Sequence, residues 1–139
     1  MAFHPEDRVV ASCSEDWSIK LWNLDDGGMI STMKGHSASV NCVDFSPDGL
    51  TIASGSGGIP HDRFTSVRVW DVKTGKQLWQ VKVDDEVSSV VYSPDGSKLA
   101  AAHWRSVSIF NVETGEVQCT VRGHRYAPSL PKECFLSFG

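Results

Sequence analysis

The chain has 139 residues, of which 40% are hydrophobic and 22% charged, and its formal net charge at pH 7 is −4. This length allows one domain, and this composition is typical of a folded globular protein rather than a disordered one. The negative net charge gives no electrostatic reason to expect nucleic acid as a partner. No apolar run approaches the roughly 20 residues that a membrane-spanning helix needs, so no membrane partner is expected either.

The cysteines and the N-terminus bear on the compartment. The N-terminal stretch MAFHPEDRVV carries charge and proline where a signal peptide has an apolar core, so we expect an intracellular protein, cytoplasmic or nuclear. The favoured interpretation is that the cysteines are reduced structural thiols, with disulfides or ligands as the alternative. No cofactor and no metal site are expected, because CxxC spacing is absent among Cys13, Cys42, Cys119 and Cys134.

Short apolar runs separated by turn residues predict strands from the first residues onward. The segment 2–34 is expected to begin at the end of a strand whose first half would lie upstream. Asp26-Gly27-Gly28 is its strongest turn signal. Further strands are predicted over residues 9–13, 19–23 and 29–33.

The segment 35–83 is the most regular part of the sequence. It opens on Gly35-His36 and reaches Trp70-Asp71, with the turn Ser46-Pro47-Asp48-Gly49 between its first two predicted strands. The interval from Ala53 to Trp70 is six residues longer than that from Ala11 to Trp22, which predicts an exposed inserted loop. Strands are predicted over residues 39–45, 50–55, 67–72 and 77–83.

The same pattern returns in the segment 84–122 and begins again in 123–139. Asp84-Asp85 stands where Gly-His is expected, and Phe110-Asn111 stands for Trp-Asp. The tail opens on Gly123-His124 as the start of a fourth unit. Strands are predicted over residues 87–92, 99–102, 107–112 and 117–121.

The spacing of these signals identifies a repeat. Gly35 and Gly123 are 88 residues apart, or 44 per unit. Units of about 40–45 residues with four strands are typical of propeller blades. With its Gly-His, Ser-Pro-Asp-Gly and Trp-Asp signals in register, the chain resembles the WD-repeat β-propeller family. The resemblance implies an all-β fold of antiparallel four-stranded blades, here a three-blade open arc or partial ring, with blades over 2–34, 35–83 and 84–122.

The resemblance also implies a hydrogen-bonded set inside each blade, made of His, Ser, Asp and Trp. The matching positions in the first blade are Ser12, Asp16 and Trp22, in the second His36, Ser54 and Trp70, and in the tail His124. Asp62 does not have the spacing of Asp16, and the third blade has Asp85, Ala102 and Phe110 in the corresponding places. We interpret the set as structural rather than as a catalytic triad, since a buried Ser is no accessible nucleophile.

Family members generally bind partners on the surface that carries the turns between second and third strands and the connections between blades. Ser39, Asn41, Glu86 and Ser88 would line the connections and suit a basic or hydrogen-bonding peptide. Trp17 and Trp104 could instead pack on a neighbouring blade. The candidate partner-binding residues are Trp17, His61, Arg63, Phe64, Glu86, Trp104 and Arg105.

The favoured function is a non-catalytic scaffold module that binds other proteins or peptides. Closed propellers typically have about four to eight blades, so three blades would leave unpaired faces and strand edges. One alternative is therefore a truncated propeller fragment without independent function, and self-association, including two chains forming one ring, stays open. An enzyme or a nucleic-acid binder that uses a propeller pocket is a further alternative.

Overall fold

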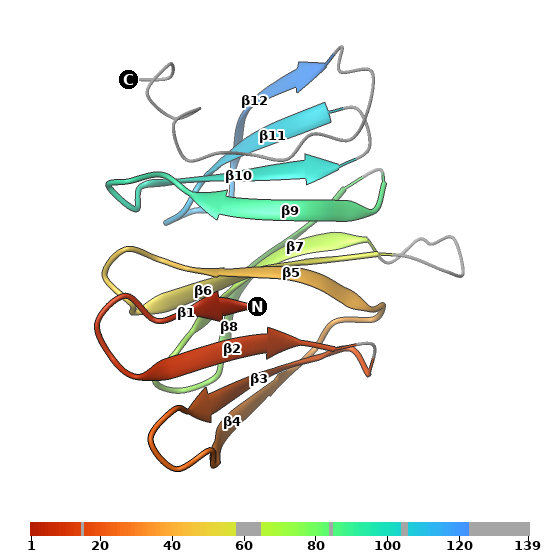
Figure 1. The fold of residues 1–139 in the computed structure, drawn as a ribbon. Helices are drawn as coiled ribbons and strands as arrows, with labels where there is room; N and C mark the ends of the chain where they lie inside the picture. Colours follow the sequence, from red (N-terminus) through yellow and green to blue (C-terminus); the bar gives the residue numbers. More distant parts are fainter. Residues whose placement is uncertain (15, 58–64, 84, 104–105, 123–139) are drawn as a thin grey trace.

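The computed structural model describes residues 1–14, 16–57, 65–83, 85–103 and 106–122. Over these ranges the chain forms three four-stranded antiparallel sheets, which we call blades 1, 2 and 3 (Figure 1). The three blades lie one after another in chain order and do not close into a barrel, which confirms the predicted all-β partial ring. In the described part of the chain, no helix is long and apolar enough to cross a membrane.

Each blade is a meander in which consecutive strands pair. Blade 1 contains β1 (Ala2–Phe3), β2 (Val9–Cys13), β3 (Ser18–Asn23) and β4 (Met29–Lys34). Blade 2 contains β5 (Val40–Phe45), β6 (Thr51–Ser56), β7 (Ser66–Asp71) and β8 (Gln77–Lys82). Blade 3 contains β9 (Val87–Tyr92), β10 (Lys98–His103), β11 (Ser106–Asn111) and β12 (Val117–Arg122).

The Ser-Pro-Asp-Gly turn is closed by its own side chains. The Ser46 hydroxyl donates to Asp48 Oδ1 (2.6 Å), which also accepts the backbone N–H of Leu50 (2.9 Å). Gly49 takes the left-handed conformation with φ of 73°, a region that favours glycine. Ser93 and Asp95 repeat the arrangement in blade 3, where hydrogen bonds from Ser93 and Ser97 lower the pKa of Asp95 to about 2. The motif therefore fixes the β5–β6 and β9–β10 hairpins.

Blade 1 uses a histidine in place of that serine. His4 Nδ1 accepts the backbone N–H groups of Glu6 (3.1 Å) and Asp7 (2.9 Å). The proton must then sit on Nε2, which donates to the carbonyl of Gly49 in blade 2 (3.2 Å). The ring also meets Phe45 edge-on, with 5.1 Å between ring centroids. His4 therefore closes its own turn and joins blade 1 to blade 2.

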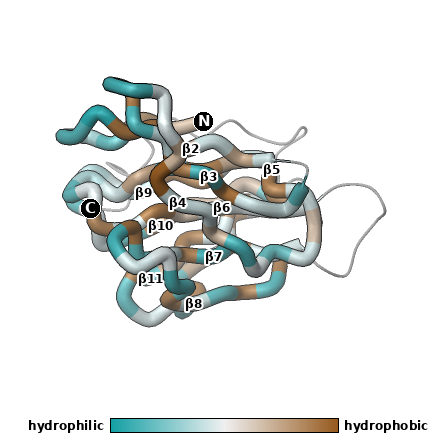
Figure 2. The backbone as a smooth tube through the Cα atoms, turned by 90° about the horizontal axis from the view of Figure 1, so that it is seen from below, coloured by the Kyte–Doolittle hydropathy of each residue, from teal (hydrophilic) through white to brown (hydrophobic). Residues whose placement is uncertain are grey.

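The hydrophobic core lies between the blades. Figure 2 shows hydrophobic residues along the strands and hydrophilic residues gathered at the turns. Between blades 1 and 2 the buried residues are Ala11, Ile19, Leu21, Met33, Val40, Val43, Phe45, Ile52 and Trp70. Between blades 2 and 3 they are Ala53, Val67, Val69, Val87, Val90, Tyr92, Leu99, Ala101 and Phe110.

Polar side chains join blades 2 and 3 at the edges of this apolar seam. The Tyr92 hydroxyl lies 2.9 Å from Thr51 Oγ1, and the Trp79 indole N–H donates to the carbonyl of Val112 (2.6 Å). A Cβ added to Gly55 would lie only 2.3 Å from Val87 Cγ1, so the Val87 side chain occupies the space that glycine leaves. This seam is thus closely packed as well as apolar.

The outer face of blade 1 has no neighbouring blade among the described residues. Phe3 pairs with Val10 and Val10 with Trp22, as Phe45 pairs with Ile52 and Ile52 with Trp70. Phe3 is 68% exposed, whereas Phe45 is 3% exposed. The phenylalanine at this position is therefore exposed to solvent in blade 1 and buried in the core in blade 2. At the other end of the stack, Val91, Ala100, Val107 and Ile109 form a buried cluster in blade 3.

Candidate functional site

The connections between blades and the turns between second and third strands gather at one end of the sheets, on the right of Figure 1. We call this the connection end, and its described residues are 14, 16–17, 35–39, 57, 65, 83 and 85–86. The predicted partner-binding residues Trp17 and Glu86 both belong to it. His61, Arg63, Phe64, Trp104, Arg105 and His124 lie outside the described residues.

Trp17 occupies an unusual backbone conformation. Its φ is 72°, in the left-handed region that bulky residues rarely adopt, and its side chain is 49% exposed. Asp16 holds the turn, because its Oδ1 accepts both the backbone N–H (3.1 Å) and the hydroxyl (2.5 Å) of Ser18. The hydrogen bond from Ser18 is the main cause that lowers the pKa of Asp16 to about 2. The turn thus presents Trp17 to solvent in a fixed backbone conformation.

Glu86 lies where blades 2 and 3 meet. The side-chain amide of Asn41 lies 3.3 Å from Glu86 Oε1 and also contacts the carbonyl oxygens of Gly57 (3.1 Å) and Val87 (3.1 Å). Asn41 and Glu86 are nevertheless exposed to solvent. The connection end therefore offers a carboxylate held by the blade seam.

Behind this surface, blade 2 contains a buried hydrogen-bonded set. Nε2 of His36 lies 2.6 Å from Oγ of Ser54, and the Trp70 indole N–H donates to the same oxygen (2.9 Å). Burial, and secondarily the charge of Arg68, lowers the pKa of His36 to about 3, so the ring is neutral at pH 7. In blade 1 the corresponding bond runs from the Trp22 indole to Ser12 Oγ (2.9 Å).

Ser66 supplies the second partner of the His36 ring. Its Oγ lies 3.3 Å from His36 Nδ1, and it accepts a hydrogen bond from Arg68 Nε (3.2 Å). The sequence pattern predicts an aspartate beside the His36 ring and does not predict Ser66 or Arg68. Asp62 lies outside the described part of the chain. Aligning the two repeats could have identified Ser66, because it occupies the position that Ser18 has in blade 1. Ser18 is the residue that hydrogen-bonds Asp16.

Blade 3 has other residues in place of this hydrogen-bonded set. The sequence spacing places Ala102 at the position of Ser54, and this assignment is wrong. Leu99 pairs with Phe110 as Ile52 pairs with Trp70, so the residue equivalent to Ser54 is Ala101 and not Ala102. Phe110 packs against Trp79 of blade 2, with 5.8 Å between ring centroids. A different buried pair is present, in which His103 Nε2 lies 2.7 Å from Ser108 Oγ. Sequence spacing does not reveal this pair, because the two side chains meet only across the β10–β11 hairpin.

The serine hydroxyls that lie next to histidines are shielded from solvent. Ser54 and Ser108, each next to a histidine, are 0% and 5% exposed, so neither hydroxyl can reach a substrate in bulk solvent. Among the described residues there is no cluster of three or more His, Cys, Asp or Glu side chains that could hold a metal ion. Cys13, Cys42 and Cys119 are free thiols, and burial raises the pKa of Cys42 to about 12, which makes it unreactive.

Replacing Ser54 by Ala should destabilise the fold more than the same change at Ser12. Ser54→Ala leaves the buried Trp70 indole and His36 ring without their shared partner, which should lower the free energy of unfolding by about 1–3 kcal/mol. Trp22 and Ser12 are only half-buried, so water can replace the lost bond and Ser12→Ala should cost less than about 1 kcal/mol. Urea unfolding of both variants measures the difference, and equal costs would contradict a special role for the blade 2 set.

His36 should make the fold less stable as the pH falls. The folded chain binds the His36 proton only near pH 3, whereas an unfolded histidine binds it near pH 6.5, so stability is lost as the pH decreases through this interval. The expected slope is about 1.4 kcal/mol per pH unit. Urea unfolding between these limits should show a shallower slope for His36→Gln than for the parent chain. Identical slopes would show that His36 does not titrate in this way.

Comparison with known proteins agrees with this architecture. The family model described as "WD domain, G-beta repeat" matches residues 1–23, 27–63 and 75–111. Over 137 residues the chain is 30% identical to Protein groucho of Drosophila melanogaster, an alignment that covers 99% of this chain and 17% of that protein. The chain thus spans less than a fifth of the length of this relative. Matches over most of its length, together with three four-stranded sheets in register, show that the chain belongs to the WD40 repeat family.

Proposed function

We propose that this chain is a non-catalytic interaction module that binds proteins or peptides at its connection end. The observation that carries the proposal is Trp17, which is exposed and held in a strained backbone conformation. A non-glycine residue in a sparsely populated conformation costs about 1–3 kcal/mol and is found mainly at functional sites. Tryptophan is also one of the residue types enriched among interface hot spots.

The groups around Trp17 favour a peptide or protein partner over a small substrate. The Trp17 turn is linked to blade 2 by the backbone N–H of Val40, which donates to the carbonyl of Ser14 (3.3 Å). Glu86 and Asn41 supply a carboxylate and an amide at the same end of the sheets. An exposed aromatic anchor with polar groups nearby is typical of protein interfaces. We place the module inside the cell, because the chain's free thiols fit a reducing compartment.

A second candidate is that this chain forms part of a larger ring, made either with further blades or with another copy of itself. The exposed Phe3 favours it, since the equivalent Phe45 is covered by blade 1. The alignment with only 17% of the groucho protein is compatible with a piece of a longer chain. In this case the module would bind partners only when its open blade faces are covered.

Binding at the connection end should depend on Trp17 while folding should not. Trp17→Gly removes the side chain but suits a positive φ, so the free energy of unfolding should stay unchanged or rise by up to about 1 kcal/mol. The affinity for peptides selected from a displayed library on the parent chain should fall more than about tenfold. Fluorescence anisotropy measures the affinity, and Leu50→Ala, an exposed apolar residue at the opposite end, is the matched control. Equal affinities in all three proteins would overturn the proposed site.

The open face of blade 1 should make the isolated chain associate with itself. Phe3→Ser removes the most exposed aromatic group of this face and should shift the distribution toward monomer in sedimentation velocity over a range of concentrations. Leu50→Ser removes a similarly exposed side chain from a turn and should leave the distribution unchanged. A parent chain that stays monomeric throughout would contradict self-association through this face.

A further inference from the structure

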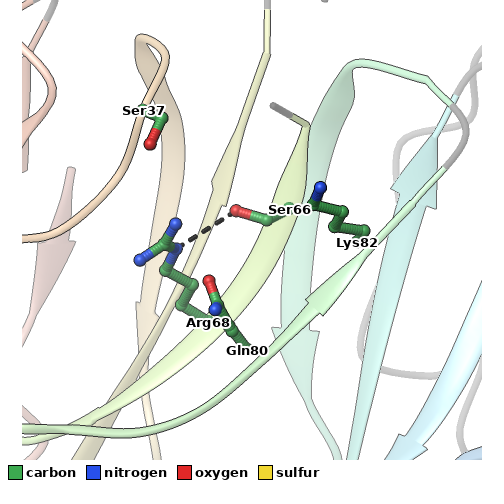
Figure 3. A pocket seen from close by; sticks show the side chains of 5 residues that line it. All are labelled: Ser37, Ser66, Arg68, Gln80 and Lys82. Atoms are coloured by element: carbon green, nitrogen blue, oxygen red, sulfur yellow. Dashed lines mark hydrogen bonds between the residues drawn. The ribbon is translucent and has the colours of Figure 1, made fainter. Parts of the chain in front are cut away.

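A pocket of about 240 Å³ lies beside the connection end, between the loop after β4 and blade 2. Ser37 contributes to it from the loop after β4, and strands β7 and β8 contribute the other side chains. Figure 3 shows Arg68 extending from β7 toward the loop that carries Ser37. The lining residues are Ser37, Ser66, Arg68, Gln80 and Lys82.

Among the described residues, the side chains that hydrogen-bond Arg68 are neutral. Arg68 is only 9% exposed, its Nε donates to Ser66 Oγ (3.2 Å) and its Nη1 donates to Gln77 Oε1 (2.7 Å). A guanidinium has more N–H donors than these two bonds use. Within the described ranges, neither Arg68 nor Lys82 forms an ion pair.

Blade 1 shows what the same position looks like when its charge is balanced. Lys20 pairs with Ser12 across β2 and β3 as Arg68 pairs with Ser54 across β6 and β7, so the two cations are equivalent. The Lys20 ammonium lies 3.7 Å from Asp16. In blade 2 the cation donates hydrogen bonds to two neutral side chains, Ser66 and Gln77. The pocket therefore contains a buried positive charge beside a second cation and two hydroxyl groups.

Gly35 is what leaves room for the guanidinium. A Cβ at this position would lie 3.2 Å from Arg68 Nη1 and 3.0 Å from the Trp70 ring, and φ is 153°, which also favours glycine. The Gly-His pair that opens the repeat thus shapes the wall of the pocket. A rigid guanidinium with free donors, flanked by an ammonium and hydroxyls, is suited to the oxygens of a carboxylate or phosphoryl group.

We propose that this pocket binds the oxyanion group of an acidic side chain, carboxylate or phosphoryl, in a protein segment that docks at the connection end. The inference rests on the proposed function and names the chemistry that the partner must carry. The pocket is distinct from Trp17 and Glu86, so the two parts of the surface would contact different residues of one partner.

The test is an NMR titration of the full 139-residue chain at constant ionic strength with three small probes. The probes are N-acetyl-phosphoserine amide, N-acetyl-glutamate amide and, as the neutral control, N-acetyl-serine amide. We expect saturable shifts of the Arg68 Nε–H and Ser66 amide signals with one or both acidic probes and none with the neutral probe. The acidic probe that binds more tightly identifies the source of the oxyanion.

Variants assign the binding to this pocket. Lys82 is exposed, so Lys82→Gln should leave the fold intact and weaken binding about two- to fivefold, whereas Lys73→Gln, an exposed lysine at the opposite end, should not change it. Arg68→Gln should reduce binding by more than about tenfold. If Arg68→Gln fails to fold, the comparison of Lys82→Gln with Lys73→Gln tests the inference. Shifts that do not saturate, or equal weakening by Lys82→Gln and Lys73→Gln, would overturn the inference. If the oxyanion pocket is wrong but the proposed function is right, library peptides should still bind through Trp17. The two failures can therefore be distinguished.

Discussion

The structure depends on burial of apolar side chains between neighbouring sheets. Each blade is only one layer thick, so it cannot form a core alone and must pack both faces against other blades. Ile52 and Trp70 of blade 2 face blade 1, whereas Ala53 and Val69 face blade 3. Alternate side chains of one strand pack against the blades on opposite sides of the sheet. Loss of one blade would therefore expose apolar surface on its neighbour. Phe3 shows this directly at the edge of the stack.

Polar contacts at the margins of the seams fix how the blades sit against one another. Apolar contact alone tolerates sliding, but directional bonds do not. His4 reaches the carbonyl of Gly49, and Thr51 meets the hydroxyl of Tyr92. Inside blade 2, Ser54 satisfies the polar atoms of His36 and Trp70, whose burial would otherwise cost free energy. The bonds of His4 and Thr51 fix the blades relative to one another at the end of the sheets opposite the connection end.

The connection end combines features that the core does not need. An exposed Trp17 with a positive φ and a buried Arg68 without an acidic neighbour among the described residues both cost stability where they stand. Departures from local preference tend to occur at functional positions, since a core residue with the same cost has no compensating use. Both features lie at the end of the sheets where chain connections leave backbone groups open to solvent. This coincidence is the main support for a binding role.

The amino-acid sequence by itself determined the repeat, the strands and the tight turns, because these depend on short-range patterns such as alternation and Ser-Pro-Asp-Gly. It also pointed to Trp17 and Glu86, which lie at the predicted end of the sheets. Only the tertiary structure decided that Ser66 contacts His36, that Ala101 replaces Ser54, and that Arg68 lines a pocket with Lys82. These facts depend on strand register and on which side chains meet across a seam, and local sequence patterns do not specify such contacts between distant residues.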